Sequence, residues 1–160
     1  MQFTRRTTFM LGGAGLLVGA FGAGFALTPR TYAPARVFVA DGLAIRGTDP
    51  VAYFTEGAAV AGDPAITHQW ADATWAFAST ANRDRFAADP TAYAPQYGGF
   101  CAWAVAAKAE LYSTQPANWA IVHGKLYLNF NDSVQAEWAT DRPGFIAQGD
   151  QKWPGIVAGA

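Results

Sequence analysis

The sequence predicts a small α+β domain in which β-hairpins are interspersed with short helices. Short apolar segments flank turn-forming dipeptides such as Asp41-Gly42 and His123-Gly124, and this pattern is typical of β-hairpins. Helix-capping residues begin the stretches between the hairpins, but strands and helices do not alternate regularly, which argues against a βαβ architecture. A length of 160 residues is typical of one domain, and we place that domain at residues 36–160.

Residues 1–35 are expected to form an export signal and a short linker. Arg5 and Arg6 precede an uncharged, glycine-rich run over residues 9–27, and the Ala33–Ala35 segment beyond it fits an A-x-A cleavage pattern. The arginine pair resembles a twin-arginine signal, with a general secretory signal and an uncleaved membrane anchor as the alternatives. The expected location is therefore the periplasm or another extracytoplasmic compartment. Membrane contact is expected only through this segment, if it is retained.

The composition of the remaining chain indicates a globular domain without a nucleic-acid partner. Removing residues 1–35 leaves 8 basic and 12 acidic residues, a net charge of −4, with no basic stripe along the sequence. Aromatic residues make up 14 % of the chain, enough to build a dense core. Cys101 is the only cysteine, so the domain has no internal disulfide and depends on packing for its stability.

The first half of the domain is expected to hold two hairpins and one helix. The predicted strands are residues 37–39, 43–45, 68–70 and 74–79, with turns at Asp41-Gly42 and over Ala71–Ala73. Residues 51–54 follow Asp49-Pro50 as a strand or a tight helical turn, because the residue before proline avoids the helical region. Ser79 or Thr80 can cap a helix that ends at Asp89-Pro90.

The second half is expected to begin with a buried helix and to continue with the clearest hairpin. Gly98-Gly99 allows a sharp backbone turn before a helix from Phe100 to about Lys108. Strands at 119–122 and 125–130 then flank the two-residue turn His123-Gly124. Two further helices are expected after the capping segments at residues 131–133 and 141–143.

Cys101 is the first candidate for chemistry. A thiol in the first turn of a helix lies near unpaired N–H groups and the positive end of the helix dipole, which lowers its pKa. The thiolate that results binds metals and attacks electrophiles. The alternative is that Cys101 is only a small core residue, because free cysteines are among the most buried residue types.

His68 is the candidate partner of Cys101. A thiolate and an imidazole together suit copper, and zinc less well, because zinc sites use at least three protein ligands. The sequence offers no certain third ligand, and the other histidine, His123, is expected to be an exposed turn residue.

Several motifs resemble the exported YHS-domain family. The matching residues include Asp49-Pro50-Val51-Ala52-Tyr53-Phe54, His68-Gln69-Trp70, Trp75-Ala76-Phe77-Ala78-Ser79, Asn82-Arg83 and Tyr97-Gly98-Gly99-Phe100-Cys101-Ala102. The resemblance runs from about Gly42 to Trp153 and implies a small α+β domain that is associated with heavy metals or with copper. The metal-binding cysteines of short YHS and related domains are replaced here, at positions that look like Ala52, Ala78 and Asn82.

Three functions are open at this point. The first is periplasmic copper binding or handling, with Cys101 and His68 as ligands. The second is a non-catalytic domain that binds a small ligand or a protein in an aromatic cleft formed by Tyr53, Trp75 and Tyr97, with Trp70 and Trp103 nearby. The third is an enzyme in which His68 activates the Cys101 nucleophile, which requires the two side chains to lie within hydrogen-bond reach. A binding protein is favoured over an enzyme.

The export signal is directly testable. Mass spectrometry of the exported protein should show a new N-terminus near Leu27 or Arg36, because the small residues that a signal peptidase accepts lie just before these positions. Recovery of only the intact Met1 form, in the membrane fraction, would instead identify an anchored protein.

Overall fold

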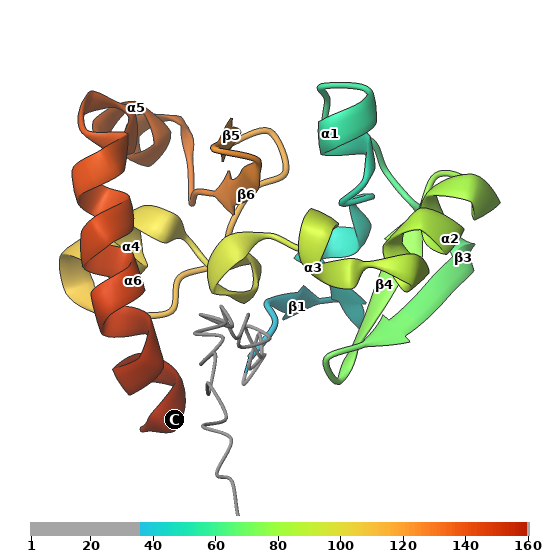
Figure 1. Cartoon of the computed structure of the whole chain (residues 1–160), viewed down its shortest axis with the longest axis horizontal. Helices are drawn as coiled ribbons and strands as arrows, with labels where there is room; N and C mark the ends of the chain where they lie inside the picture. The colour runs from blue at the N-terminus through green and yellow to red at the C-terminus, as the bar shows by residue number, and fades with distance from the viewer. Residues whose placement is uncertain (1–35, 160) are drawn as a thin grey trace, which may run out of the picture. The chain divides into compact units, whose positions relative to one another are not determined.

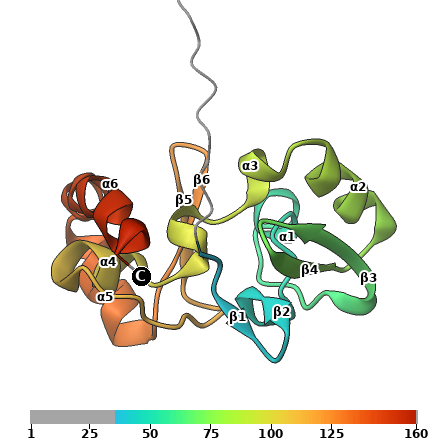
Figure 2. The same ribbon diagram turned by 90° about the horizontal axis from the view of Figure 1, so that it is seen from below.

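The computed structural model describes residues 36–159, which form the expected α+β domain. This part of the chain contains three antiparallel strand pairs and six α-helices (Figures 1 and 2). The strands are β1 (Val39–Ala40), β2 (Leu43–Ala44), β3 (Asp63–Trp70), β4 (Ala73–Phe77), β5 (Trp119–Val122) and β6 (Lys125–Leu128). The α-helices are α1 (Ala52–Thr55), α2 (Thr80–Ala88), α3 (Pro90–Tyr93), α4 (Ala102–Lys108), α5 (Asp132–Thr140) and α6 (Arg142–Ala158), and η1 (Ile45–Gly47) and η2 (Gln96–Gly99) are 3₁₀ helices. The predicted export signal lies outside the described residues. Within residues 36–159, no helix has both the length and the apolar character needed to cross a bilayer.

A two-residue turn with positive φ at both positions closes each of the three strand pairs. The φ values are 53° and 80° at Asp41-Gly42, 56° and 55° at Ala71-Asp72, and 49° and 73° at His123-Gly124. This backbone is that of a type I′ turn, whose twist matches the right-handed twist of the flanking strands. The middle turn is one residue shorter than predicted, because Ala73 pairs with Trp70 and so belongs to β4.

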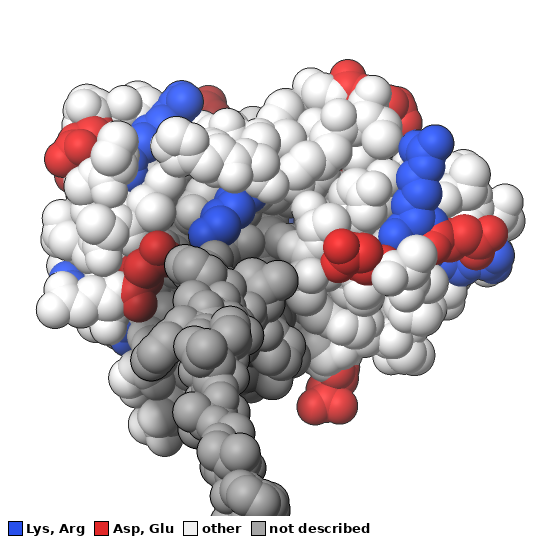
Figure 3. Space-filling view, in the orientation of Figure 1, with Lys and Arg blue, Asp and Glu red and all other residues white. Residues whose placement is uncertain are grey.

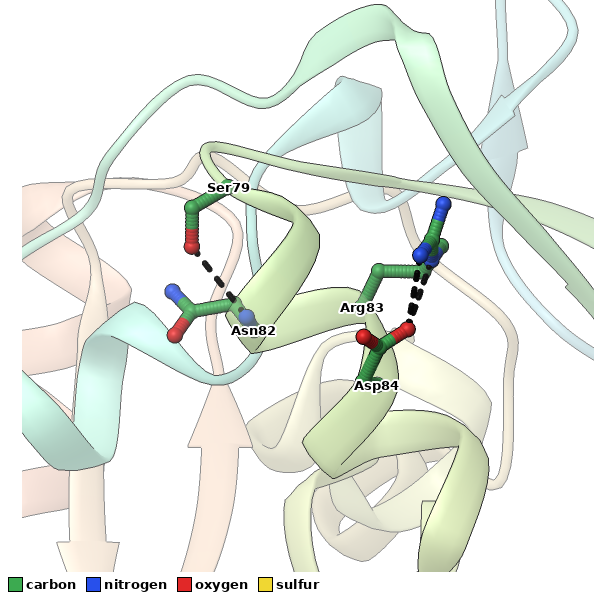
Figure 4. Close-up of polar contacts among 4 residues, drawn as sticks. All are labelled: Ser79, Asn82, Arg83 and Asp84. Atoms are coloured by element: carbon green, nitrogen blue, oxygen red, sulfur yellow. Dashed lines mark hydrogen bonds and ion pairs between the residues drawn. The ribbon is translucent and has the colours of Figure 1, made fainter.

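The β3–β4 hairpin packs an aromatic face against α2. The rings of Trp75 and Phe77 lie 5.1 and 5.2 Å from the ring of Phe86, and Trp70 meets the same ring edge-on at 5.7 Å. The helix begins as predicted at a capping serine, since Ser79 Oγ accepts a hydrogen bond from the Asn82 N–H at 3.1 Å (Figure 4). The neighbouring Arg83–Asp84 ion pair in the same view is exposed, and such pairs add little stability.

The β5–β6 hairpin separates two hydrophobic clusters. Successive side chains of a strand point to opposite faces. Leu126 and Leu128 therefore join the cluster that contains Trp75 and Phe86, whereas Tyr127 between them joins a second cluster with Tyr97 and Trp138. Strand β5 divides in the same way, with Trp119 and Ile121 on the first side and Ala120 and Val122 on the second. Both faces of this hairpin are therefore covered.

Helices α4 and α6 pack together in the second cluster. Gly149 of α6 lies under the ring of Tyr97, where an added Cβ would come within 2.5 Å of the phenol oxygen. The same phenol lies 2.9 Å from Asp150 Oδ1, and Lys152 Nζ donates a hydrogen bond to the carbonyl of Ala106 in the last turn of α4. A cation near the C-terminal end of a helix is favourable for the helix dipole. The C-terminal helix is thus fixed by a close backbone approach and by polar contacts.

The turn at Ala71-Asp72 generates a stability prediction. Ala71 adopts a left-handed conformation that asparagine tolerates better than alanine does, so Ala71→Asn should raise the free energy of unfolding by about 1 kcal/mol. Urea unfolding with an unchanged m-value would measure the gain. Ala136→Asn, at an exposed position inside α5, is the matched control and should lower the free energy of unfolding by about 0.5 kcal/mol. Equal losses in the two variants would show that Ala71 carries no strain.

Candidate functional site

Cys101 lies in a closed polar environment where β6, α4 and a preceding loop meet. It occupies the N-cap position of α4, and its side chain is fully buried. The thiol donates to Asn129 Oδ1, with the sulfur 3.5 Å from that oxygen. Its backbone N–H donates to the carbonyl of Tyr112 at 3.0 Å. Both the side chain and the backbone of Cys101 are therefore engaged by neighbours.

Burial raises the pKa of the Cys101 thiol, and the prediction of a lowered pKa is wrong. The backbone N–H groups of Ala104, Phe130 and Trp103 favour the thiolate, but the loss of solvent outweighs them. Helix α4 has only seven residues, so its dipole is a small contribution beside complete burial. Cys101 is consequently a neutral thiol at neutral pH, which supports its interpretation as a core residue.

Asn129 organises this environment, although the sequence indicated it only as part of a hairpin. Its side chain is fully buried, and its Oδ1 accepts a further hydrogen bond from the N–H of Trp103 at 3.1 Å. Its Nδ2 donates to Gln135 Oε1 at 2.7 Å, and Gln135 Nε2 donates in turn to the carbonyl of Trp119. The amide thereby connects the end of β6 to the starts of α4 and α5. In the sequence, the only sign of this role is that an asparagine directly follows an apolar strand.

His68 lies far from Cys101. It is a half-buried residue of β3, with its ring 6.2 Å from the ring of Phe86. Strand β3 and helix α4, which Cys101 precedes, lie at opposite ends of the domain in both Figure 1 and Figure 2. The structure therefore brings the pair together neither as copper ligands nor as nucleophile and base. Across residues 36–159 there is also no group of three or more His, Cys, Asp and Glu side chains that could hold a metal ion. Among the described residues, Cys101 and His68 therefore do not form the predicted copper site.

The three predicted cleft residues are buried in the hydrophobic core. Tyr53 and Trp75 are each 1 % exposed in the first cluster, and Tyr97 is 4 % exposed in the second. Their polar atoms are bonded internally: the Tyr53 hydroxyl donates to the Pro116 carbonyl at 2.9 Å, and Trp75 Nε1 donates to the Trp70 carbonyl at 3.0 Å. Burial raises the pKa of both tyrosines, and at Tyr97 the nearby Asp150 raises it further. These side chains build the fold and do not line an open cleft.

A different set of aromatic side chains is partly exposed. Phe54 of α1 meets Tyr93 of α3 edge-on with ring centres 5.6 Å apart, and Trp119 of β5 lies 5.1 Å from the buried Tyr53 that precedes Phe54. Phe54, Tyr93 and Trp119 are each half-buried against the first cluster, and we call these three residues the aromatic face. Figure 3 shows that the surface between α1 and β5 is largely free of Lys, Arg, Asp and Glu. The three residues of the aromatic face belong to elements that meet at α1, and each keeps part of its surface exposed.

The second polar centre of the domain is the fully buried Asp49. Its Oδ1 accepts hydrogen bonds from the N–H groups of Val51 at 2.8 Å and Ala52 at 3.3 Å. Its Oδ2 accepts from the N–H of Ala78 and from Asn82 Nδ2, both at 2.8 Å. The carboxylate satisfies the free N–H groups at the start of α1, so residues 51–54 form a helical turn and not a strand. From the sequence alone, Asp49 is notable mainly as the residue before a proline.

Comparisons with protein-family models, with curated proteins and with solved structures give no match for this chain.

The buried thiol makes a prediction about copper. Wild type, Cys101→Ser and His68→Ala should show equal copper(I) affinity in a competition titration, because the two side chains form no common site. A thiol reagent should modify Cys101 at the rate of unfolding, since the native sulfur is enclosed. Cys101→Ser should lower the free energy of unfolding by about 1 kcal/mol, because Asn129 can still accept from the hydroxyl. A large loss of copper affinity in Cys101→Ser alone would contradict this assignment.

Proposed function

We propose that this chain is an exported YHS-like protein that acts by binding a partner protein, and not by catalysis. The α+β fold agrees with the domain that the resemblance implies. Several motif residues that are distant in sequence also meet around the Asp49 carboxylate, as expected if the motif specifies a fold. The N-terminal sequence supports export, because its order of charged, apolar and small residues is that of a signal.

The state of the candidate nucleophile favours binding over catalysis. A catalytic cysteine needs an activating base within hydrogen-bond reach and access to substrate. Cys101 is enclosed, its pKa is raised, and its thiol donates to an amide oxygen. The buried Asp49 and Asn129 side chains are likewise occupied by internal hydrogen bonds. These polar groups are used to hold the fold together.

The observation that carries the proposal is the aromatic face. Tryptophan and tyrosine are enriched at protein interfaces, where each buries a large apolar area while keeping a polar atom for hydrogen bonding. Trp119 and Tyr93 are held in place through their contacts with α1, so their side chains lose little entropy when a partner binds. The three aromatic side chains themselves carry no charge, which suits a partner segment with apolar side chains.

Site-specific photo-crosslinking in the native compartment tests this function. A benzophenone amino acid is placed at position 93 or 119 of the full chain, and cells are irradiated before the periplasmic contents are separated. We expect the same single crosslinked protein from both positions, because both side chains pack against α1. A matched probe at Ala136, an exposed position of α5, should give no such product.

Two results would reject the proposal. The first is the absence of a crosslinked protein from both positions in correctly exported chains. The second is capture of the same protein from position 136 as from position 93, because binding would then not depend on the aromatic face. A partner identified by crosslinking from position 93 or 119 should bind the purified wild type at least roughly tenfold more tightly than it binds Trp119→Ala. This loss is typical of an aromatic contact at an interface.

A further inference from the structure

The three positions that resemble those of the metal-binding cysteines in short YHS domains meet at one point in this structure. The backbone N–H groups of Ala52 and Ala78 and the side-chain amide of Asn82 all donate to the Asp49 carboxylate, over distances of 2.8 to 3.3 Å. Asp49 and Asn82 are separated by 33 residues in the sequence, so only folding brings this group together.

We infer that the Asp49 carboxylate closes this junction as an anion held by N–H donors, so that the fold of the domain requires no metal ion. The chemistry of the partners carries the inference. A metal centre is lined by lone pairs that point at a cation, whereas Asp49 is met by four N–H donors. A cation at this point would face the positive ends of those N–H bonds.

The number of hydrogen bonds that the carboxylate can accept leads to the same conclusion. An ionised carboxylate has about four lone-pair sites, and Asp49 uses its two oxygens to accept four hydrogen bonds. The position of Asn82 in the first turn of α2 adds the favourable field at the start of that helix. These N–H dipoles therefore compensate the buried charge. A metal ion could bind the carboxylate only after displacing some of these donors, each of which would then be buried without a partner.

Asn82→Asp distinguishes a metal centre from a hydrogen-bonded carboxylate, because the two centres predict opposite effects of zinc on the stability of the variant. In a metal centre the new carboxylate would be an additional ligand, and zinc would stabilise the variant. In the hydrogen-bonded centre it replaces a donor with a like charge beside Asp49 inside the protein, which is strongly unfavourable. Asn131→Asp is the matched control, because Asn131 caps α5 with its Oδ1 and aspartate caps equally well.

Urea unfolding of the full chain, with excess EDTA, with zinc and with copper(I), provides the measurement. The wild-type midpoint should be the same in all three conditions. Asn82→Asp should lower the folded-to-unfolded ratio by at least roughly 30-fold, and zinc should not restore it. Asn131→Asp should unfold like wild type.

Three results would overturn the inference. They are a lower wild-type midpoint in EDTA, a stoichiometric metal ion in protein purified without chelator whose removal unfolds the domain, and recovery of Asn82→Asp by zinc. If Asn82→Asp does not fold under any condition, the EDTA and metal-content arms on wild type still decide the question. These results are independent of the crosslinking test, which concerns a different surface.

Discussion

A buried carboxylate that accepts four N–H hydrogen bonds is the constraint around which the first half of the domain is arranged. Burying a charge is costly unless hydrogen bonds compensate it, and the four donors around Asp49 come from the start of α1, the end of β4 and the first turn of α2. Once these donors converge, the rest of the region is largely determined. Helix α1 begins at the N–H groups that Asp49 engages, which directs Tyr53 into the core and leaves Phe54 at the surface. Helix α2 is held against β4, which brings Phe86 onto Trp75 and Phe77.

Asn129 has the corresponding role in the second half, with a neutral amide in place of a charge. It follows β6 directly and bonds to the first turn of α4 and to α5, so it fixes both helices relative to the hairpin. Its contact with Cys101 explains why the only thiol of the chain is enclosed: the sulfur fills space beside an amide that has to be buried to hold three elements together. The two polar centres thus account for the enclosed position of Cys101 and for the partly exposed position of Phe54.

The sequence predicted the local features of the fold well and the candidate site poorly, for physical reasons. Asp41-Gly42 and His123-Gly124 are turns because their own residues tolerate positive φ, and Ser79 caps a helix through its own hydroxyl. These properties depend on a few adjacent residues. The copper and cleft predictions required knowing which distant side chains meet. His68 and Cys101 belong to elements at opposite ends of the domain, and Tyr53, Trp75 and Tyr97 are divided between two clusters. Aromatic composition indicates that a core exists but does not tell which rings remain at its boundary.

The two-sided burial of the β5–β6 hairpin has a consequence for how such a chain can vary. On an ordinary surface hairpin every second residue faces water and can drift freely, but Leu126, Tyr127 and Leu128 alternate between two packed interiors. An insertion of one residue in β6 would exchange the side chains delivered to each interior, so both would be mispacked by the same event. Within this hairpin, a change in length is accommodated best at the exposed tip, His123-Gly124. There, nothing lies within 4 Å of an added Cβ on the glycine. That tip is where the chain offers room for a peptide tag, a fluorophore or, over evolutionary time, an acquired loop.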